Sequence, residues 1–229
     1  MEKIKKNRPL SISAVLLLAV ATSCVTPEST PVEAPRAPVR LILGVDISGT
    51  TKNFQRMDTS FLKQVIAKCK QSKRTVYLAF KTIGDVTDKN FIRAAITALP
   101  TKNANDPLYV QEKIQNEIIA LEKFNNEEEK RFLNDVNLVL KNVNQADTDL
   151  NGFFKMSNFL MSEFPAHTIV CIQSDGYQDT NNKKLDCNIL DKNSYLAAVG
   201  WKNSEECHFD ARPEGLQGFI FVLRELLKQ

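Results

Sequence analysis

Two short clusters of oxygen-bearing side chains are the most chemically informative residues in this sequence, because each one directly follows an apolar run. The first is Asp46, Ser48 and Thr50, and the second is the tripeptide Ser174-Asp175-Gly176. Alternate residues of an extended chain point to the same side, so the side chains of the first cluster can converge. Carboxylate and hydroxyl oxygens gathered in this way can bind a cation or orient a polar ligand.

Two predicted strands must hold these clusters. Residues 39–45 and 168–173 are nearly continuous apolar runs, which is typical of parallel strands buried on both faces of a sheet. Open parallel sheets bind ligands at the carboxyl ends of their strands, and both clusters fall at such ends. A polar turn at 147–152 precedes a predicted helix, so Thr148 can approach from a third direction.

Strand and helix patterns alternate along the remaining chain. Further strands are expected at 75–82 and 194–200, and helices over a segment ending near 73 and at about 88–99, 108–123, 127–143, 150–163 and 215–228. This alternation predicts an α/β fold with a Rossmann-like, mainly parallel sheet flanked by helices. The domain is expected over 39–229, with a helical insertion at about 85–145.

Together the polar motifs resemble those of the von Willebrand factor A (vWA) family. Its metal-ion-dependent adhesion site combines a D-x-S-x-S/T motif, a threonine from a later loop and an aspartate in a T/S-D-G motif. Asp46, Ser48 and Thr50 match the first motif, Thr148 the second and Asp175 the third. The resemblance implies a vWA-like domain in which these residues hold a metal. The helical insertion departs from the family, which commonly has an additional edge strand there.

The donor atoms of this set suit a hard divalent cation. Two carboxylates and three hydroxyls offer only oxygen, which favours Mg²⁺, Mn²⁺ or Ca²⁺ over zinc or copper. Mg²⁺ is the preferred prediction, because Ca²⁺ usually takes more oxygen ligands. So few protein ligands would leave positions for water or a visiting carboxylate. We therefore expect a protein partner that offers an Asp or Glu side chain, with Tyr177, Gln178 and Asp179 bordering the metal.

Other interpretations of the same residues remain open. Asp, Ser, Gly and Thr are ordinary turn residues, so each cluster alone could simply end a strand or cap a helix. Residues 44–52 also look like the phosphate-binding loop of ROK-family sugar kinases, and Asp46 begins a near match to the D-x-D-G-T motif of haloacid dehalogenase-type phosphatases. The alternative function is therefore a metal-dependent, phosphate-handling enzyme using Asp46. We expect no enzyme, because Ser48 cannot replace the second Asp of those phosphatases as an acid/base, and neither His167 nor His208 belongs to a catalytic motif.

Residues 1–23 predict export. Four cations and one anion precede a short apolar stretch at 12–21, well below the roughly 20 residues of a permanent membrane span. Ala21-Thr22-Ser23-Cys24 resembles a lipobox, which would make Cys24 the acylated first residue. The Pro-rich residues 24–38 would then form a tether. We expect a lipid-anchored protein of the cell envelope, at the periplasmic or surface face of the outer membrane. Ordinary cleavage after Ala21 would instead release a soluble periplasmic protein.

The charge and the cysteines add two smaller expectations. The net charge of +3 is contributed by the residues before Ser23, so the rest of the chain is near neutral and has no electrostatic footprint for nucleic acid. Disulfides can persist in an exported protein. Cys187 and Cys207 lie in polar segments on either side of a predicted strand and form the expected disulfide. Cys171 lies in an apolar run and is expected to remain a buried thiol.

Overall fold

A single sheet of parallel strands with one antiparallel edge organises the domain. The computed structural model describes residues 36–48, 51, 55–84, 90–141, 147–177, 185–203 and 207–228. Within them a five-stranded sheet has the order β3-β2-β1-β4-β5, formed by β1 (Val39–Asp46), β2 (Val76–Ile83), β3 (Ile92–Ile96), β4 (His167–Gln173) and β5 (Tyr195–Val199). All neighbouring strands are parallel except β2 and β3. The predicted α/β fold with a mainly parallel sheet is confirmed.

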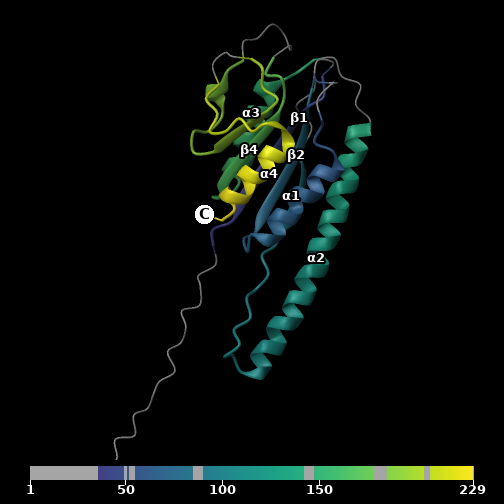
Figure 1. The fold of residues 1–229 in the computed structure, drawn as a ribbon, viewed down its shortest axis with the longest axis vertical. Coiled ribbons are helices and arrows are strands. Elements are labelled where there is room, and N and C mark those ends of the chain that lie inside the picture. The colour runs from purple at the N-terminus through teal and green to yellow at the C-terminus, as the bar shows by residue number, and fades with distance from the viewer. Residues whose placement is uncertain are drawn as a thin grey trace, which may run out of the picture. The chain divides into compact units, whose positions relative to one another are not determined.

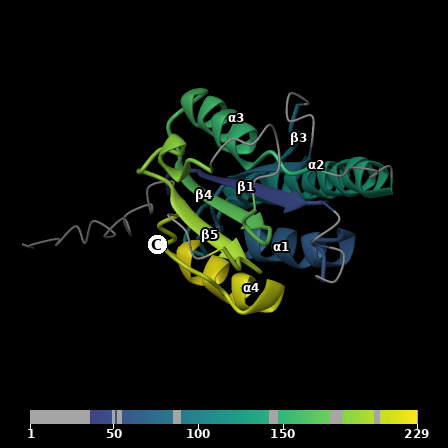
Figure 2. The ribbon, with the colours of Figure 1, turned by 90° about the horizontal axis from the view of Figure 1, so that it is seen from above.

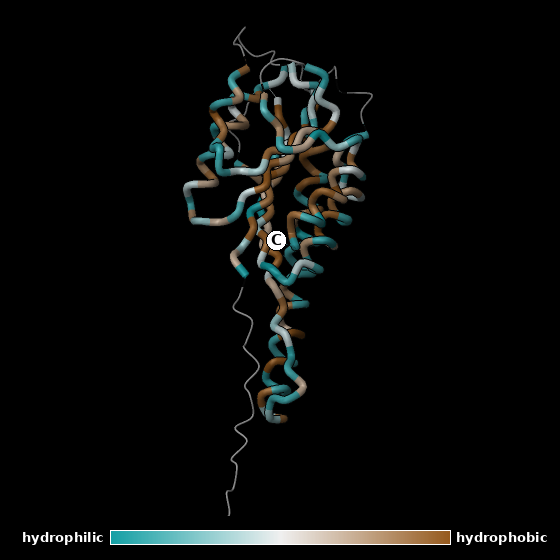
Figure 3. Tube along the Cα trace, turned by 60° about the vertical axis from the view of Figure 1, so that its left-hand side comes forward, coloured by the Kyte–Doolittle hydropathy of each residue, from teal (hydrophilic) through white to brown (hydrophobic). Residues whose placement is uncertain are grey.

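Helices cover both faces of this sheet (Figures 1 and 2). α1 (Thr59–Gln71), α4 (Gly215–Leu226) and the second half of α2 (Leu108–Lys141) pack on one face, and α3 (Leu150–Ser162) packs on the other. Leu41 and Leu43 of β1 belong to the first core, whereas Ile42 belongs to the second with Phe153 of α3. Burial on both faces explains why β1 is a nearly continuous apolar run. Figure 3 shows the same concentration of apolar residues in the strands.

The helix predicted at about 88–99 is wrong, because residues 92–96 form the edge strand β3. Ile92, Ala94 and Ile96 alternate along the strand, and Ala94 and Ile96 are buried. Alanine is compatible with helix or strand, so pairing with β2 outweighs the local preference. The described part of the expected helical insertion therefore contains an edge strand, the element that the vWA family commonly has there.

α2 is one helix of 34 residues, so the predicted break at 124–126 does not occur. Asn125, a residue that often ends helices, is buried in its middle. Its side-chain amide donates to the carbonyl of Thr97 at 2.9 Å and accepts from the amide N–H of Thr97 at 2.8 Å. Because both polar groups of the side chain are used on the chain just after β3, Asn125 does not compete for the backbone of its own helix.

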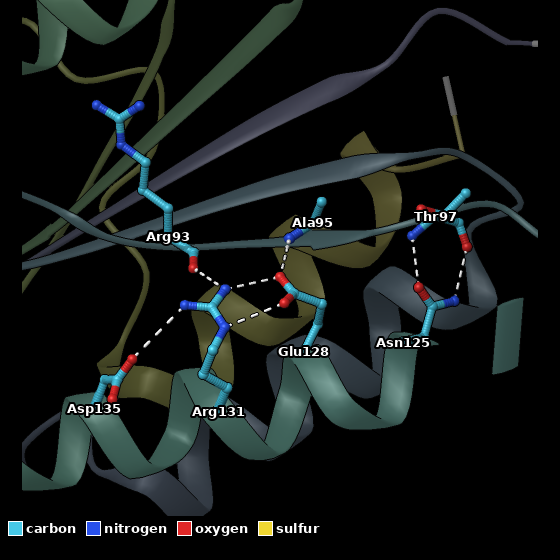
Figure 4. Close-up of polar contacts among 7 residues, drawn as sticks. All are labelled: Arg93, Ala95, Thr97, Asn125, Glu128, Arg131 and Asp135. Atoms are coloured by element: carbon cyan, nitrogen blue, oxygen red, sulfur yellow. Dashed lines mark hydrogen bonds and ion pairs between the residues drawn. The ribbon is translucent and has the colours of Figure 1, made fainter. Parts of the chain in front are cut away.

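The next residues on the same side of α2 continue these contacts along β3 (Figure 4). The Glu128 carboxylate accepts from the N–H of Ala95 at 3.4 Å, and the Arg131 guanidinium donates to the carbonyl of Arg93 at 2.9 Å. Arg131 also pairs with Glu128 at 2.8 Å, and this hydrogen bond lowers the pKa of Glu128. An edge strand presents unpaired backbone groups that can recruit another strand. Side chains of α2 supply partners to those groups here.

Candidate functional site

The carboxylate of Asp46 is the centre of the predicted site. Asp46 ends β1, and only 1% of the residue is exposed. It accepts hydrogen bonds from Ser48 N at 2.9 Å, from Thr148 Oγ1 at 3.3 Å and from Ser174 Oγ at 2.7 Å. These donors come from the loop after β1, the turn before α3 and the end of β4. Segments up to 128 residues apart in sequence therefore meet at one buried carboxylate.

The register of the sheet explains why two of these segments meet. β1 and β4 are parallel, with Val45 opposite Gln173. Asp46 and Ser174 are the next residues of the two chains, so both leave the sheet at the same edge. Side chains at the carboxyl ends of neighbouring parallel strands are brought together in this way without any special loop geometry.

Capping of α3 helps position the third segment. The Asp149 side chain accepts from the N–H of Gly152 at 2.9 Å, a typical N-cap interaction. Thr148, immediately before the cap, is fully buried. The structure thus places Thr148 in contact with Asp46, although its position relative to the other motifs was the least constrained by the sequence.

The loop after β1 is folded back on itself. The Thr51 hydroxyl lies within hydrogen-bonding distance of the carbonyl oxygens of Asp46, at 3.1 Å, and Ser48, at 3.0 Å. Ser48 is 1% exposed, so the loop holds it in the buried cluster. Thr50, the second hydroxyl predicted in this loop, lies outside the described residues.

Asp175 follows Ser174 directly and is also buried, with 4% exposed. Its carboxylate accepts from the N–H of Tyr177 at 3.3 Å. Its carbonyl accepts from the backbone N–H groups of Lys202 and Asn203, both at 3.0 Å. The loop after β5 therefore holds the backbone of the Ser-Asp-Gly motif by hydrogen bonds to Asp175. The neighbouring Ser174 hydroxyl connects the same motif to Asp46.

Three other predicted residues lie outside the described residues: Gln178, Asp179 and the lipidation site Cys24. Tyr177, predicted with the first two to border the metal, is 50% exposed. It is next but one to Asp175 in the chain, so an aromatic surface is available beside the cluster.

Two supporting residues were missed by the sequence reasoning. Gln173 accepts from the N–H of Met57 at 2.7 Å and donates to the carbonyl of Gln55, which fastens the segment before α1 to the end of β4. Its only signal is a polar residue at the end of an apolar run. The role of Ser174 as a donor to Asp46 could have been inferred from its place in the motif.

Trp201 is a third supporting residue, and unlike the other two it had no sequence signal. A Cβ atom added at Gly176 would lie 2.5 Å from the indole of Trp201, so the ring packs directly on the glycine. The Phe209 ring packs edge-on against the same indole, with centroids 4.7 Å apart. The indole N–H is buried and has no hydrogen-bond partner in the described part of the chain. Packing, rather than hydrogen bonding, holds Trp201 behind the motif.

The cysteines divide into a bridged pair and two thiols. Cys187 and Cys207, the pair predicted from the sequence, form a disulfide with their Cα atoms 5.2 Å apart. Cys69 and Cys171 are free and buried. Burial raises the pKa of the Cys69 thiol to about 12 and raises that of Cys171 as well. Neither thiol is suited to act as a nucleophile near neutral pH, since the thiolate is the reactive form.

The donor set fits a hard divalent cation. The hydrogen bonds to Asp46 use three of the roughly four lone-pair positions of an ionised carboxylate, which leaves one for a metal. Ser48, Thr148 and Asp175 add further buried oxygen atoms. Among the described residues no group of three or more His, Cys, Asp and Glu side chains forms a metal site, and His167 and His208 are both exposed. A metal would therefore rest on carboxylates together with hydroxyls.

Comparisons with known proteins give structural similarity only. No family model and no curated protein matches the chain. Among solved structures, it is similar to the pilus adhesin SpaC of Lactobacillus rhamnosus GG in its open conformation, with a TM-score of 0.44 and 10% identity over 84% of this chain and 30% of that one. It is also similar to the ArnB paralog VWA2 of Sulfolobus acidocaldarius, with a TM-score of 0.38 and 9% identity over 84% of this chain and 46% of that one. The chain thus spans less than half the length of either protein.

Proposed function

We propose that this chain binds a divalent cation at the carboxyl end of its sheet and, through that cation, an acidic group on a protein partner. The observation that supports this most directly is the buried Asp46 carboxylate, at which Ser48, Thr148 and Ser174 converge. Asp46, Ser48, Thr148 and Asp175 would hold the cation, together with Thr50. Mg²⁺ is the preferred ion, with Mn²⁺ and Ca²⁺ as alternatives.

The charge of the cluster supports a bound cation. Asp46 and Asp175 are both nearly inaccessible to solvent, and neither forms an ion pair within the described part of the chain. Removing an ionised carboxylate from water is costly unless other groups compensate its charge. Hydrogen bonds from hydroxyls and backbone amides compensate part of it. A divalent cation would match the remaining charge of the two carboxylates.

The choice of partner follows from the same charges. When bound, the cation would present a positive position to groups arriving from solvent. The carboxylates of Asp46 and Asp175 would already balance the charge of the cation, so the occupied site would be near neutral. Its open coordination position would still attract one more negatively charged oxygen ligand. A partner Asp or Glu side chain has the required chemistry. The half-exposed Tyr177 beside Asp175 would supply contact area for discriminating between partners.

This chemistry suits adhesion, assembly or scaffolding at a cell envelope. The predicted signal, Cys24 and the Pro-rich residues 24–38 would anchor the domain to a membrane surface, from which it could reach a neighbouring protein. In the described part of the chain, no helix is both long and apolar enough to cross a membrane. We propose that the chain is attached to the membrane through a lipid on Cys24.

The test compares Asp46→Asn with Asp135→Asn, an Asp on α2 whose side chain is 45% exposed. Calorimetric titration with Mg²⁺, Mn²⁺ and Ca²⁺ should show binding to the wild type and to Asp135→Asn, and none to Asp46→Asn. With Mn²⁺ bound, an Asp-containing peptide should displace metal-bound water and lower the water-proton relaxation rate. The same peptide with Asn should not. Equal metal binding by all three proteins would refute the proposal.

A pull-down from envelope extracts then tests the partner. Capture should require both the metal and Asp46, so EDTA and Asp46→Asn should each abolish it. A partner retained equally by wild type and variant, with and without EDTA, would contradict the metal-dependent mechanism. Turnover of a phosphate ester by the wild type but not by Asp46→Asn would replace it with the enzyme alternative.

A further inference from the structure

A pocket of about 260 Å³ lies beside the sheet, away from the Asp46 cluster. It opens over Ala79 of β2 and Ala95 of β3, on the face of the sheet that carries α3. It also reaches Arg40, the second residue of β1, whereas Asp46 is the last residue of that strand. At about 3.3 Å per residue, the two positions are separated by roughly 20 Å along the strand. The pocket is therefore independent of the proposed metal site.

The three arginines that line the pocket are not equivalent. Arg93 pairs with Glu163 at 2.9 Å, and Arg131 pairs with Glu128 at 2.8 Å. Figure 4 shows that the Arg131 guanidinium is also committed to the backbone of β3, while the Arg93 side chain points away from α2. The charges of these two arginines are thus balanced by carboxylates on the pocket's own walls.

Arg40 is the arginine whose charge is not balanced at contact distance. It is 3% exposed, and among the described residues it donates to neutral acceptors only: the carbonyl of Phe164 at 2.8 Å, that of Met161 at 3.3 Å and the hydroxyl of Thr168 at 3.3 Å. Burial lowers the pKa of Arg40, because desolvation disfavours its charged form. An anion seated in the pocket would offset this cost, and a guanidinium presents a donor geometry that matches a carboxylate.

The remaining walls are apolar and flat. Ala79 and Ala95 have the small side chains that leave room above the sheet. Tyr77 and Phe164 stand beside them with their rings edge-on at 4.7 Å, and the Arg40 guanidinium lies 4.2 Å from the centre of the Phe164 ring. Ligand sites combine such apolar surfaces with a few convergent polar groups, and this pocket is near the lower end of their usual size, roughly 300 Å³.

We propose that this pocket binds a small organic acid that has a carboxylate on a flat, apolar or aromatic body. The carboxylate pairs with Arg40, and the body lies over Ala79 and Ala95 against the two aromatic rings. The ligand is small because the pocket holds about 260 Å³. It is an anion because Arg40 is the arginine of the pocket that no carboxylate of the described residues contacts; the charge of Glu163, which pairs with Arg93, acts on Arg40 only from beyond ion-pair distance.

The test uses 2-naphthoate as the probe and the uncharged 2-naphthamide as its shape-matched control. Both are titrated into the purified chain in EDTA, so the result does not depend on the proposed metal site. Amide shifts in ¹H–¹⁵N NMR spectra should change at Tyr77 and Ala95 rather than near Asp46. The naphthamide should bind about tenfold more weakly, as expected for loss of a charge-assisted hydrogen bond.

Two variants and matched controls locate the binding. Ala95→Leu fills the pocket without removing a polar contact and should weaken naphthoate binding by about tenfold. Ala67→Leu, at an exposed position of α1, should change it by less than about twofold. Arg40→Gln should also lose the preference for the acid, whereas Arg224→Gln, an arginine stacked on Phe221 outside the pocket, should keep it. Unchanged affinity in Ala95→Leu, equal binding of acid and amide, or shifts confined to the Asp46 region would each overturn the proposal.

Discussion

Gly176 stands between the candidate ligand Asp175 and the half-exposed Tyr177, and two separate constraints require it to be glycine. Its φ of 88° lies in the left-handed region, which side chains with a Cβ rarely adopt. The indole of Trp201 also fills the space that a Cβ would take. Gly215 at the start of α4 shares the first constraint, with φ of 66°, but has nothing within 4 Å of an added Cβ. Substituting Gly215 therefore introduces backbone strain alone, whereas substituting Gly176 introduces backbone strain and a steric clash, so comparing the two variants separates these effects.

We expect Gly176→Ala to lower the free energy of unfolding by more than about 2 kcal/mol, because overpacking against Trp201 adds to the strain of positive φ. Gly215→Ala should cost about 1 kcal/mol, from φ alone. Urea denaturation followed by circular dichroism measures both. Gly176→Ala should also weaken Mg²⁺ binding in a titration, while Gly215→Ala should not. Equal losses of stability in the two variants would show that Trp201 does not constrain the motif.

Among single residues, the sequence identified those that belong to a recognisable motif and missed those that act by contacting segments far away in the chain. Asp46 and Asp175 were recognisable because each belongs to a short polar motif at the end of a buried apolar run: Asp46 is the last residue of β1, and Asp175 lies two residues after β4. Trp201 and Gln173 act on segments far away in the sequence, so neither their type nor their neighbours indicated the contact.

Among the elements, α2 and β3 depend on each other. Asn125, Glu128 and Arg131 are spaced three residues apart, so they lie on one side of the helix and meet the backbone of the edge strand. Both errors in the predicted secondary structure concern this pair. Periodicity reports which face of a segment is apolar, but it does not report hydrogen bonds between a helix side chain and a distant strand. β1 and β4 were predictable because burial on both faces leaves a nearly continuous apolar run.

Replacing Asn125 by Ala should lower the free energy of unfolding by roughly 1–3 kcal/mol, because the N–H and carbonyl of Thr97 would lose buried partners. Asn116→Ala, at an exposed position of the same helix, controls for the change in helix propensity and should be neutral or slightly stabilising. Native-state hydrogen exchange gives a local measurement. The amide of Thr97 should exchange faster in Asn125→Ala, while amides of β1 keep their protection relative to global stability. Unchanged exchange at Thr97 would mean that α2 does not protect this edge.

For the molecule as a whole, the sheet supports two chemically different surfaces. Hydroxyls and carboxylates meet where β1 and β4 end, and an arginine stands over the ring of Phe164 near the beginning of β1. The first surface was predictable, because parallel strands bring their carboxyl ends together whatever the details of packing. The second was not, since it depends on how the end of α3 and the side of α2 meet the sheet edge. Charge gave no indication of it either, because four of the five charged residues that line the pocket pair with each other.

We propose that the whole chain is held at a membrane through Cys24, which the sequence predicts to be the acylated first residue of the mature protein. Burial of acyl chains contributes about 0.8 kcal/mol per CH₂, so several chains on one cysteine would hold a near-neutral domain at a membrane without help from basic residues. Cys24→Ala should therefore lose incorporation of labelled fatty acid and leave the membrane fraction. Cys69→Ala, which alters a buried thiol of α1, should keep both. Membrane fractionation after metabolic labelling, with mass determination of the mature N-terminus, gives the measurement. If Cys24→Ala is processed at the same position and sediments with membranes as the wild type does, cleavage and retention do not use a lipid on this residue.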